Sequence, residues 1–420
     1  MERALATLGA DACLWEDFNA LCDCGGRLAG STSEARALRF ARERLTSIGG
    51  TVTMQPVSYA GWTLEGAELA LDDGTALVCH PLLGTQSTLP EGLVGEVCDL
   101  GRGSEEDFAR DSAELKGRIA LVRHEYMFGT HTIHRRRKLG WAMDAGAIGF
   151  IIAHPDPGAG PVSGSSGRAG GVGIPAVATD FESALRLSAR GGARTRARLR
   201  VLGQDSTAST EVMTLDLPGG TDQWIVISAH LDGHDLGESA MDNATGVAAA
   251  IALARALAPH LSACARGLHL CLFSAEEWAL AGSKQYLDRM DPAARAAIGL
   301  NINLDTVAGD PHLTALTSDF PHLNAFVGDT ARQAATDIGT YLPTMPNSDH
   351  YNFARHGIPA LRLVAGFDRP ASNVRHVLTR ADLRNTVDRG DLLRATRIAT
   401  MLAWQALTMA DAELAALRMR

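Results

Sequence analysis

The sequence has no long apolar run. No stretch approaches the roughly 18 uninterrupted apolar residues that a membrane-spanning helix needs, so we expect no membrane span. The N-terminus, MERALATLGADACLWEDF, has neither the basic start nor the apolar centre of a secretory signal. These two absences predict a cytoplasmic protein.

Paired cysteine patterns are also missing. The seven cysteines are an odd number, and Cys22 and Cys24 are separated by one residue, not by the two of a typical zinc or redox pair. Cys264 and Cys271 flank or lie in an apolar strand, where a thiol packs as a small core side chain. We interpret all seven as reduced thiols.

A basic face is missing as well. The net charge of -9 is modest and spread along the chain, which argues against a nucleic-acid partner. The one basic run, HRRRK at 134–138, is predicted to be a solvated helix start. With 46% hydrophobic residues and a mean hydropathy of -0.01, the chain has ample material for a globular core. Its 420 residues indicate two or three structural units.

Three segments differ in their pattern. Residues 1 to about 50 are predicted to be helical, because SEARALRFARERLTSIGG has apolar residues at helical spacing and stops at a Gly-Gly pair. Residues 90–204 contain the strands GRIALVRH and IGFIIAH around a helix, and Gly158 to Gly173 is expected to be a long exposed loop. From residue 205 onward, strands and helices alternate regularly. We therefore predict an α/β fold with boundaries at 89/90 and 204/205.

Acidic and imidazole side chains follow three apolar runs of the last segment. WIVISA directly precedes His230, LHLCLFSA directly precedes Glu276, and AIGLNINL directly precedes Asp305. An open α/β sheet places its chemistry at the carboxyl ends of its strands. The sequence therefore predicts a metal site at one edge of one sheet.

The residue types suggest separate roles. His230 is an imidazole ligand, and Asp232 can accept its other N–H and fix the tautomer. Asp242 precedes a helix and can bridge two cations, whereas Asn243 and Thr245 also suit ordinary helix capping.

The later clusters add carboxylates and a second imidazole. Glu276 and Glu277 are adjacent, so one can bind a metal while the other takes a proton from water as general base. Asp305 ends an apolar strand, which favours a buried ligand. His350, in the loop before another strand, is a candidate for substrate binding.

These clusters, in this order, resemble the M28 family of metallopeptidases, which contains aminopeptidases and carboxypeptidase-Q-like enzymes. The similar blocks are HLD at 230–232, MDNATG at 241–246, SAEE at 274–277, NLD at 303–305 and SDHYNF at 348–353. The resemblance covers about residues 205–410. Residues 90–200 resemble the protease-associated domain through GRIALVRH, MDAGAIGFIIAH and GIPAVATD, and GGRLAGSTSEARALRFARERL resembles the start of such enzymes.

The resemblance implies a phosphorylase/hydrolase-like three-layer α/β sandwich with a mixed sheet. Residues 1–89 and 205–420 would form this catalytic domain, with the β-rich protease-associated domain inserted at 90–204. The resemblance also implies functional roles for five residues: His230, Asp242 and Asp305 around one metal ion, Asp242 and Glu277 around a second, and Glu276 as the base. Asp232, two residues after His230 in the sequence, is predicted as a further catalytic residue.

One part of the family pattern is absent. The family's fifth ligand is a His four residues before an Asp-Thr pair, but here Leu378 stands four residues before Asp382, and Leu383 replaces the Thr. Either His376 supplies the ligand from two positions earlier, or the second metal position is weak or empty. A divalent position that loses a neutral donor should bind its ion less tightly.

We therefore predict a metal-dependent hydrolase that cleaves a C–N bond with one or two divalent ions. Zinc or manganese is expected, and cobalt or iron also suit His and carboxylate ligands. The first hypothesis is an aminopeptidase acting on short peptides or small amides. The alternatives are a small-molecule aminohydrolase or amidase, which would release ammonia from an aromatic amino-acid-like substrate, and an inactive binding module. Arg369 and Arg375 are candidates for holding a substrate carboxylate. We expect a homo-oligomer with no membrane or nucleic-acid partner.

Overall fold

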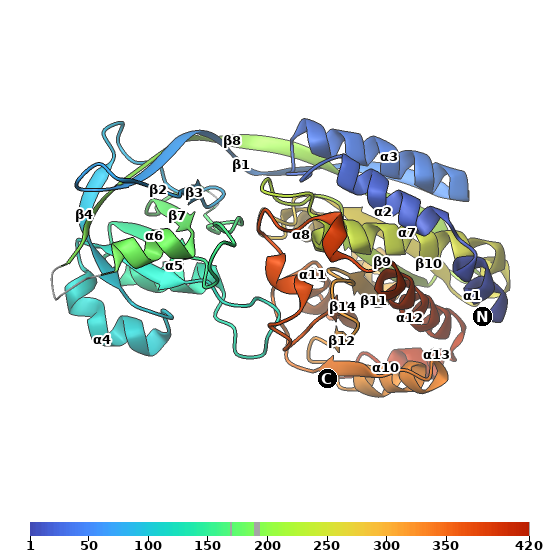
Figure 1. Cartoon of the computed structure of the whole chain (residues 1–420). Coiled ribbons are helices and arrows are strands. Elements are labelled where there is room, and N and C mark those ends of the chain that lie inside the picture. Colours follow the sequence, from blue (N-terminus) through green and yellow to red (C-terminus); the bar gives the residue numbers. More distant parts are fainter. Residues whose placement is uncertain (169, 189–193, 420) are drawn as a thin grey trace. The chain divides into compact units, whose positions relative to one another are not determined.

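The chain forms two compact units. A computed structural model describes residues 1–168, 170–188 and 194–419. Unit 1 comprises Met1–Ser58, Ser209–Val377 and Asp382–Arg420, and unit 2 comprises Tyr59–Ala208 and Leu378–Ala381. The division therefore falls at 58/59 and 208/209, whereas the sequence suggested 89/90 and 204/205. The N-terminal and C-terminal parts of the chain, blue and red in Figure 1, both belong to unit 1.

A mixed sheet forms the centre of unit 1. Its four central strands are β14 (Ala360–Ala365), β11 (Ile298–Leu304), β9 (Trp224–His230) and β10 (Gly267–Phe273), which pair in this order and run parallel. Strand β8 (Arg196–Leu217) pairs antiparallel with β10. At the other edge β12 (Leu313–Leu316) pairs antiparallel with β14 and parallel with β13 (Ile338–Tyr341). The predicted mixed α/β architecture is confirmed.

The helix α7 (Thr245–Leu257) is the core helix of unit 1. Nearly every side chain of TGVAAAIALARAL is buried, because the helix packs on β9 and also against α2 (Cys13–Asp23) and α12 (Arg389–Thr408). A helix that is apolar on all sides belongs in the interior of a protein or in a membrane. The stretch Ala240–Ala263 has the length and composition of a membrane span, and 78% of its most apolar window is buried within the protein, as in a core helix.

The other elements of unit 1 complete its helical layers and loops. Helix α11 (His350–Arg355) packs on β11 and β14 and against α8 (Ala281–Arg289). The remaining elements are α1 (Glu2–Gly9), α3 (Thr32–Ile48), α9 (Pro292–Ala296), α10 (His322–Gln333), α13 (Asp411–Ala416), the π-helical turn Ala240–Ala244 and the 3₁₀ turns Ala258–Ala263, Asn373–His376 and Arg384–Thr386.

Unit 2 has its own sheet and core. Strands β4 (Leu93–Asp99), β5 (Ile119–Arg123), β6 (Gly149–Ala153) and β7 (Ala176–Thr179) run parallel, and β3 (His80–Pro81) pairs antiparallel with β7. Apolar side chains of these strands pack against the helices of the unit. Those helices are α4 (Glu105–Leu115), α5 (Arg135–Asp144) and α6 (Phe181–Leu187), and β2 (Ala76–Leu77) pairs with β1.

Strands β1 and β8 each belong partly to both units. β1 covers Thr51–Leu71 and β8 covers Arg196–Leu217. Two apolar runs, TRARLRVLG and STEVMTLDLPG, lie almost entirely in the single strand β8. The polar residues between the two apolar runs continue the strand instead of forming a turn. For this reason the boundary predicted from the change in composition, 204/205, differs from the boundary between the units, 208/209.

Two sequence-based predictions in unit 2 were wrong. The basic run is not a solvated helix start: Lys138 is fully buried, and its ammonium donates to the carbonyls of Arg102 and Arg123 and to the Glu125 carboxylate. The segment from Gly158 to Gly173, in which residue 169 lies outside the described residues, is not uniformly exposed. Ser163 is fully buried, and Ser166 donates its hydroxyl to the Leu83 carbonyl at 2.9 Å. Buried hydrogen bonds hold both segments inward.

Candidate metal centre

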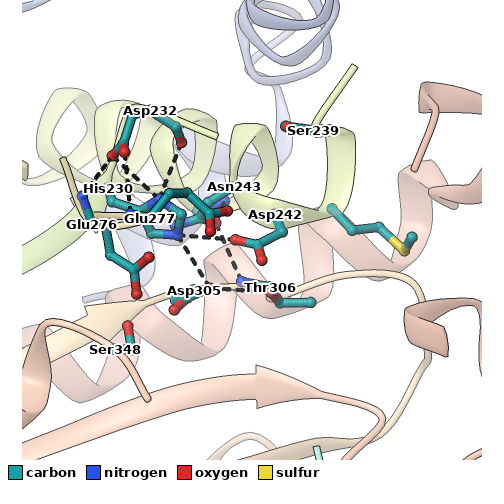
Figure 2. A network of polar contacts seen from close by, with 12 residues as sticks. His230, Asp232, Ser239, Asp242, Asn243, Glu276, Glu277, Asp305, Thr306 and Ser348 are labelled. Atoms are coloured by element: carbon teal, nitrogen blue, oxygen red, sulfur yellow. Dashed lines mark hydrogen bonds and ion pairs between the residues drawn. The ribbon is translucent and has the colours of Figure 1, made fainter. Parts of the chain in front are cut away.

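The carboxyl ends of three parallel strands deliver the predicted site residues to one place. His230 is the last residue of β9, and its register partner on β10 is Phe273, three residues before Glu276. Asp305 follows directly after β11, and Asp242 lies in the turn before α7. Figure 2 shows the Asp242 and Asp305 carboxylates directed at the His230 imidazole.

His230 presents one ring nitrogen to carboxylates. Its Nε2 lies 2.9 Å from Asp242 Oδ1 and 3.6 Å from Asp305 Oδ1, and its side chain is 1% exposed. Its Nδ1 lies 3.1 Å from the backbone carbonyl oxygen of Asp232. A carbonyl oxygen can only accept, so Nδ1 carries a proton and the neutral ring has its lone pair at Nε2.

Asp232 has a different contact from the predicted one. Its Oδ1 is 3.7 Å from His230 Nδ1, too long for a hydrogen bond, and the backbone carbonyl takes that place. The buried carboxylate instead accepts the backbone N–H groups of Glu276 at 3.1 Å and Glu277 at 3.2 Å. Asp232 therefore holds the backbone of the segment that carries both glutamates.

The two glutamates are in an acidic environment. Burial raises the pKa of Glu276 well above its ordinary value, and the carboxylates of Glu277 and Asp349 raise it further against the opposing effect of His230. Burial, followed by the Asp242 carboxylate, raises the pKa of Glu277 to about 7. Ligand atoms of His230, Glu276 and Asp305 lie within 4.8 Å of one another.

These residues fit a divalent cation. The Asp242 Oδ1, Glu277 Oε1 and His230 Nε2 atoms are buried and accept no hydrogen bond from any described residue. Buried carboxylates without donors are costly unless a cation compensates them. Two ligand atoms on one tetrahedral zinc, each about 2.0–2.2 Å from the ion, lie about 3.4 Å apart. The two His230 distances, 2.9 and 3.6 Å, lie on either side of that value.

A proton competes with the cation at the same place. Although burial opposes it, the surrounding carboxylates, with Glu276 foremost, raise the pKa of His230 well above its usual value. Without a cation, the ring can take a second proton at Nε2 and donate it to Asp242. Metal binding at this nitrogen must displace that proton.

Arg362 was missed by the sequence analysis. It lies on β14, is almost fully buried, and its Nη2 is 3.1 Å from Asp305 Oδ1. Although burial opposes it, this guanidinium holds the pKa of Asp305 well below its usual range. The signal in the sequence was one charged residue inside the otherwise apolar strand IPALRLVAG.

His234 was also missed, and it is not a suitable metal ligand. Its ring is fully buried, with Nε2 3.6 Å from Asp382 Oδ2. Its Nδ1 accepts the backbone N–H of Leu236 at 3.2 Å, so the proton of the neutral ring is on Nε2 and faces Asp382. Asp382 in turn accepts the backbone N–H of Met241 at 2.7 Å and of Asp242 at 3.3 Å. The pair thus positions the Asp242 backbone.

Leu378 and His376, the two residues considered for the family's fifth ligand, belong to different units. Leu378 is 2% exposed, has a φ of +63°, and belongs to unit 2. His376 is the half-buried last residue of the 3₁₀ turn Asn373–His376 in unit 1, and its role as a ligand stays a prediction.

The predicted substrate-binding residues divide into buried and exposed ones. His350 is fully buried, and burial together with Arg362 lowers its pKa to about 3, so the ring is neutral. Arg369 and Arg375 are exposed, and Arg375 donates Nη1 to the carbonyls of Ala371 and Ser372 in its own loop. The substrate-binding roles of all three residues stay predictions.

An α/β fold with an imidazole and four carboxylates at the strand ends defines a metal-dependent hydrolase. Residues 212–403 match Peptidase family M28 and residues 91–187 match the PA domain. The segment 212–403 is therefore an M28-type peptidase domain, and the segment 91–187 is a PA domain. Both resemblances seen in the sequence are confirmed.

The chain is also similar to two named relatives. The chain is 25% identical over 354 residues to Aminopeptidase YwaD of Bacillus subtilis, which covers 81% of this chain and 72% of the relative. It is 27% identical over 289 residues to Carboxypeptidase Q of Bos taurus, which covers 62% of this chain and 58% of the relative.

Two solved structures share the fold. A Peptidase M28 precursor from Shewanella amazonensis superposes with a TM-score of 0.80 at 20% identity, covering 97% of this chain and 96% of that one. BSAP, a zinc aminopeptidase from Bacillus subtilis, gives a TM-score of 0.73 at 20% identity, covering 97% and 95%.

Proposed function

We propose that this M28 metallohydrolase is a zinc-dependent aminopeptidase that removes the first residue of short peptides. The observation that carries the proposal is the buried group of His230, Asp242 and Asp305 with Glu276 beside it. The names of two similar proteins, an aminopeptidase and a zinc aminopeptidase, support the substrate class and the metal.

The ligand residues would hold the ion in a fixed place. His230, Asp242 and Asp305 would bind the first ion, and Glu277 with Asp242 would serve a second. A divalent cation held there supplies Lewis acidity, which polarises a carbonyl oxygen and acidifies water. Arg362 keeps Asp305 ionised, because the guanidinium contacts its carboxylate at 3.1 Å.

Glu276 is the proposed general base. Burial and the neighbouring carboxylates raise its pKa, which increases its proton affinity, as a general base requires. It would take a proton from the attacking water and return it to the leaving nitrogen as the C–N bond breaks. The products are then a free amino acid and a peptide shortened by one residue. Asp232 supports the step by holding the Glu276 backbone N–H.

A second candidate is a small-molecule aminohydrolase that releases ammonia. It is favoured by Leu378 at the position of the family's fifth ligand, and by the tautomer of His234, which turns an N–H towards Asp382. A substrate with its own carboxylate or phenolic donor would then complete a single-ion site.

One assay separates the two functions. The protein is stripped with chelator, reloaded with zinc or manganese, and offered leucine, alanine and phenylalanine p-nitroanilides and dipeptides. Parallel samples receive aminobenzoic acids, with ammonia as the readout. Hydrolysis of the aminoacyl substrates, lost in Glu276→Gln at unchanged metal content, is expected. Ammonia release without aminoacyl hydrolysis would assign the aminohydrolase function instead, and activity in neither panel would overturn both.

A further inference from the structure

A second cavity lies at the opposite edge of the sheet of unit 1. It encloses about 490 Å³ at the amino ends of the strands. Trp224, the first residue of β9, and Ile298, the first of β11, both line it. The same strands end at His230 and next to Asp305. At about 3.3 Å per residue, the two edges are separated by about 20 Å. The cavity is therefore distinct from the metal centre.

One wall of the cavity is a fixed polar chain. Asp216 on β8 and His269 on β10 are directly opposite in the antiparallel register. Asp216 Oδ1 is paired with His269 Nδ1, and His269 Nε2 lies 2.7 Å from the Tyr286 hydroxyl. The imidazole also packs between Trp224, at a ring-centroid distance of 6.1 Å, and Tyr286, at 6.3 Å. These contacts on both ring nitrogens and on the ring itself hold the polar wall in place.

The lining has a net negative charge. Two carboxylates, Asp216 and Asp222, line the cavity together with the imidazole of His269, and the lining includes no Lys or Arg. Although burial opposes it, the neighbouring Cys271 and Asp216 raise the pKa of His269 to about 10, so its imidazolium offsets one of the two carboxylates. Asp216 is half-exposed, and its Oδ2 is not used in the pair with His269. Asp222 is exposed, and the described part of the chain provides no ion pair for it. The lining therefore offers acceptors for a positively charged donor.

The rest of the wall is largely apolar and includes an indole ring. Its apolar residues are Trp224, Met290, Ala294, Ala297 and Ile298, and Trp224 lies beside His269. Small-molecule sites combine such an apolar wall with a few convergent polar groups, and the volume is within their usual range. An indole face also attracts a cation.

We propose that this cavity binds a primary ammonium group attached to a flat apolar body, as in an arylalkylamine. The ammonium group lies at Asp216 and Asp222, and the apolar body lies against Trp224. An anion is disfavoured by the net negative charge of the lining. A free amino acid is a poorer ligand, because its carboxylate finds no Lys or Arg in the lining.

Phenethylamine is the probe, titrated by calorimetry into the zinc-loaded protein. 2-Phenylethanol and 3-phenylpropionate are matched for the ring and lack the positive charge. We expect one phenethylamine per chain, and binding of either control at least tenfold weaker. Asp222→Asn should weaken phenethylamine binding about fivefold, as for a partly exposed ion pair of about 1 kcal/mol. Asp337→Asn, which removes an exposed carboxylate elsewhere in unit 1, should leave it unchanged.

Two further variants locate the binding. Ala294 is exposed on α9 and lines the cavity, so Ala294→Trp should fill the space and abolish binding without disturbing the core. His230→Ala, which removes a metal ligand, should leave phenethylamine binding intact. Loss of binding in His230→Ala with no effect of Asp222→Asn would place the amine at the metal centre and overturn the proposal. Absence of any binding to the wild-type protein would overturn it as well.

Discussion

The contacts of Asp242 and Glu277 differ in a way that bears on the two proposed metal positions. Asp242 Oδ1 lies 2.9 Å from His230 Nε2, whereas Glu277 is an electrostatic neighbour of Asp242 and His234. We expect Asp242→Ala to remove the ion shared with His230 and, with it, all activity. Glu277→Ala should lower metal content by no more than one ion per chain. Metal content after dialysis, measured by mass spectrometry for both variants, checks this. A larger loss in the Glu277 variant would reverse the assignment.

A carboxylate of unit 2 makes stability depend on pH. Asp99 accepts Arg123 Nη1 at 3.0 Å and Nη2 at 2.7 Å, and also the Gly101 N–H at 3.0 Å. Although burial opposes it, these hydrogen bonds and that of Ser188 hold the pKa of Asp99 below its usual value. A lowered folded-state pKa stabilises the protein above the unfolded-state value of about 3.9, and this contribution is lost as the pH falls through the folded-state pKa.

Asp99→Asn should therefore lower the unfolding free energy by about 2 kcal/mol at pH 7, since charge-assisted hydrogen bonds are lost. The difference from wild type should shrink between pH 7 and a pH below the folded-state pKa, where the native carboxyl also becomes neutral. Urea unfolding at the two pH values measures it. Asp156→Asn, which removes an exposed carboxylate of the same unit, is the matched control. An equal loss at both pH values would mean that the charge of Asp99 contributes nothing.

Residue types and their order were sufficient to predict that His230, Asp242 and Asp305 lie close together. His230, Asp242 and Asp305 follow apolar runs, and the parallel strands bring their ends together. Arg362 and His234 were not predictable in this way, because their importance depends on partners that are distant in the sequence. Arg362 matters through Asp305, and His234 through Asp382. The role of Asp232 changed because a backbone carbonyl reached the imidazole first.

At the scale of elements, the link between the N-terminal helices and the metal-site loop depends on Arg27. The residue has a φ of +58° and is fully buried. Its guanidinium donates five hydrogen bonds to backbone carbonyls, those of Leu21, Gly25, Leu231, Glu238 and Ser239. Three of these acceptors lie in the loop that joins His230 to Asp242.

Arg27→Met should lower the unfolding free energy by about 3–5 kcal/mol, because buried carbonyls lose their donors. It should also weaken metal binding, since the loop between two ligands is released. Arg27→Lys keeps the charge and three N–H donors, so its loss should be smaller. The exposed Arg39→Met serves as the control. Thermal unfolding and zinc titration of the three variants test this. Wild-type zinc affinity in Arg27→Met would show that the loop between His230 and Asp242 keeps its conformation without Arg27.

Local sequence patterns predicted the strands themselves better than the three-dimensional surroundings of individual side chains. The apolar runs predicted β9, β10 and β11, because buried parallel strands are continuous apolar stretches. The same reasoning failed where polar residues are internal. Lys138 is buried because backbone carbonyls and a carboxylate surround its ammonium. Nothing in the run HRRRK indicates those partners, since they come from other segments of unit 2.

At the scale of the whole molecule, two of the crossings between the units, at 58/59 and 208/209, lie within strands. Because β1 and β8 have no break in their ladder, composition changes do not mark the boundaries at 58/59 and 208/209. The predicted metal ligands His230, Asp242, Glu277 and Asp305 all belong to unit 1, which has its own core. A unit with its own core can in principle fold alone.

Unit 1 is therefore expected to fold and bind metal without unit 2. The test variant joins Ser58 to Ser209 by Asn-Gly, which suits a tight turn between paired antiparallel strands, and replaces Leu378–Ala381 by Gly-Ser-Gly-Ser. Ser58 and Ser209 are suitable ends for this link because they lie on β1 and β8, which pair with each other. Circular dichroism should show cooperative thermal unfolding, and the zinc content should equal that of the full chain. The same deletion carrying His230→Ala is the control and should fold with less zinc. A variant that is unfolded, or folded without zinc, would mean that the metal centre depends on residues of unit 2.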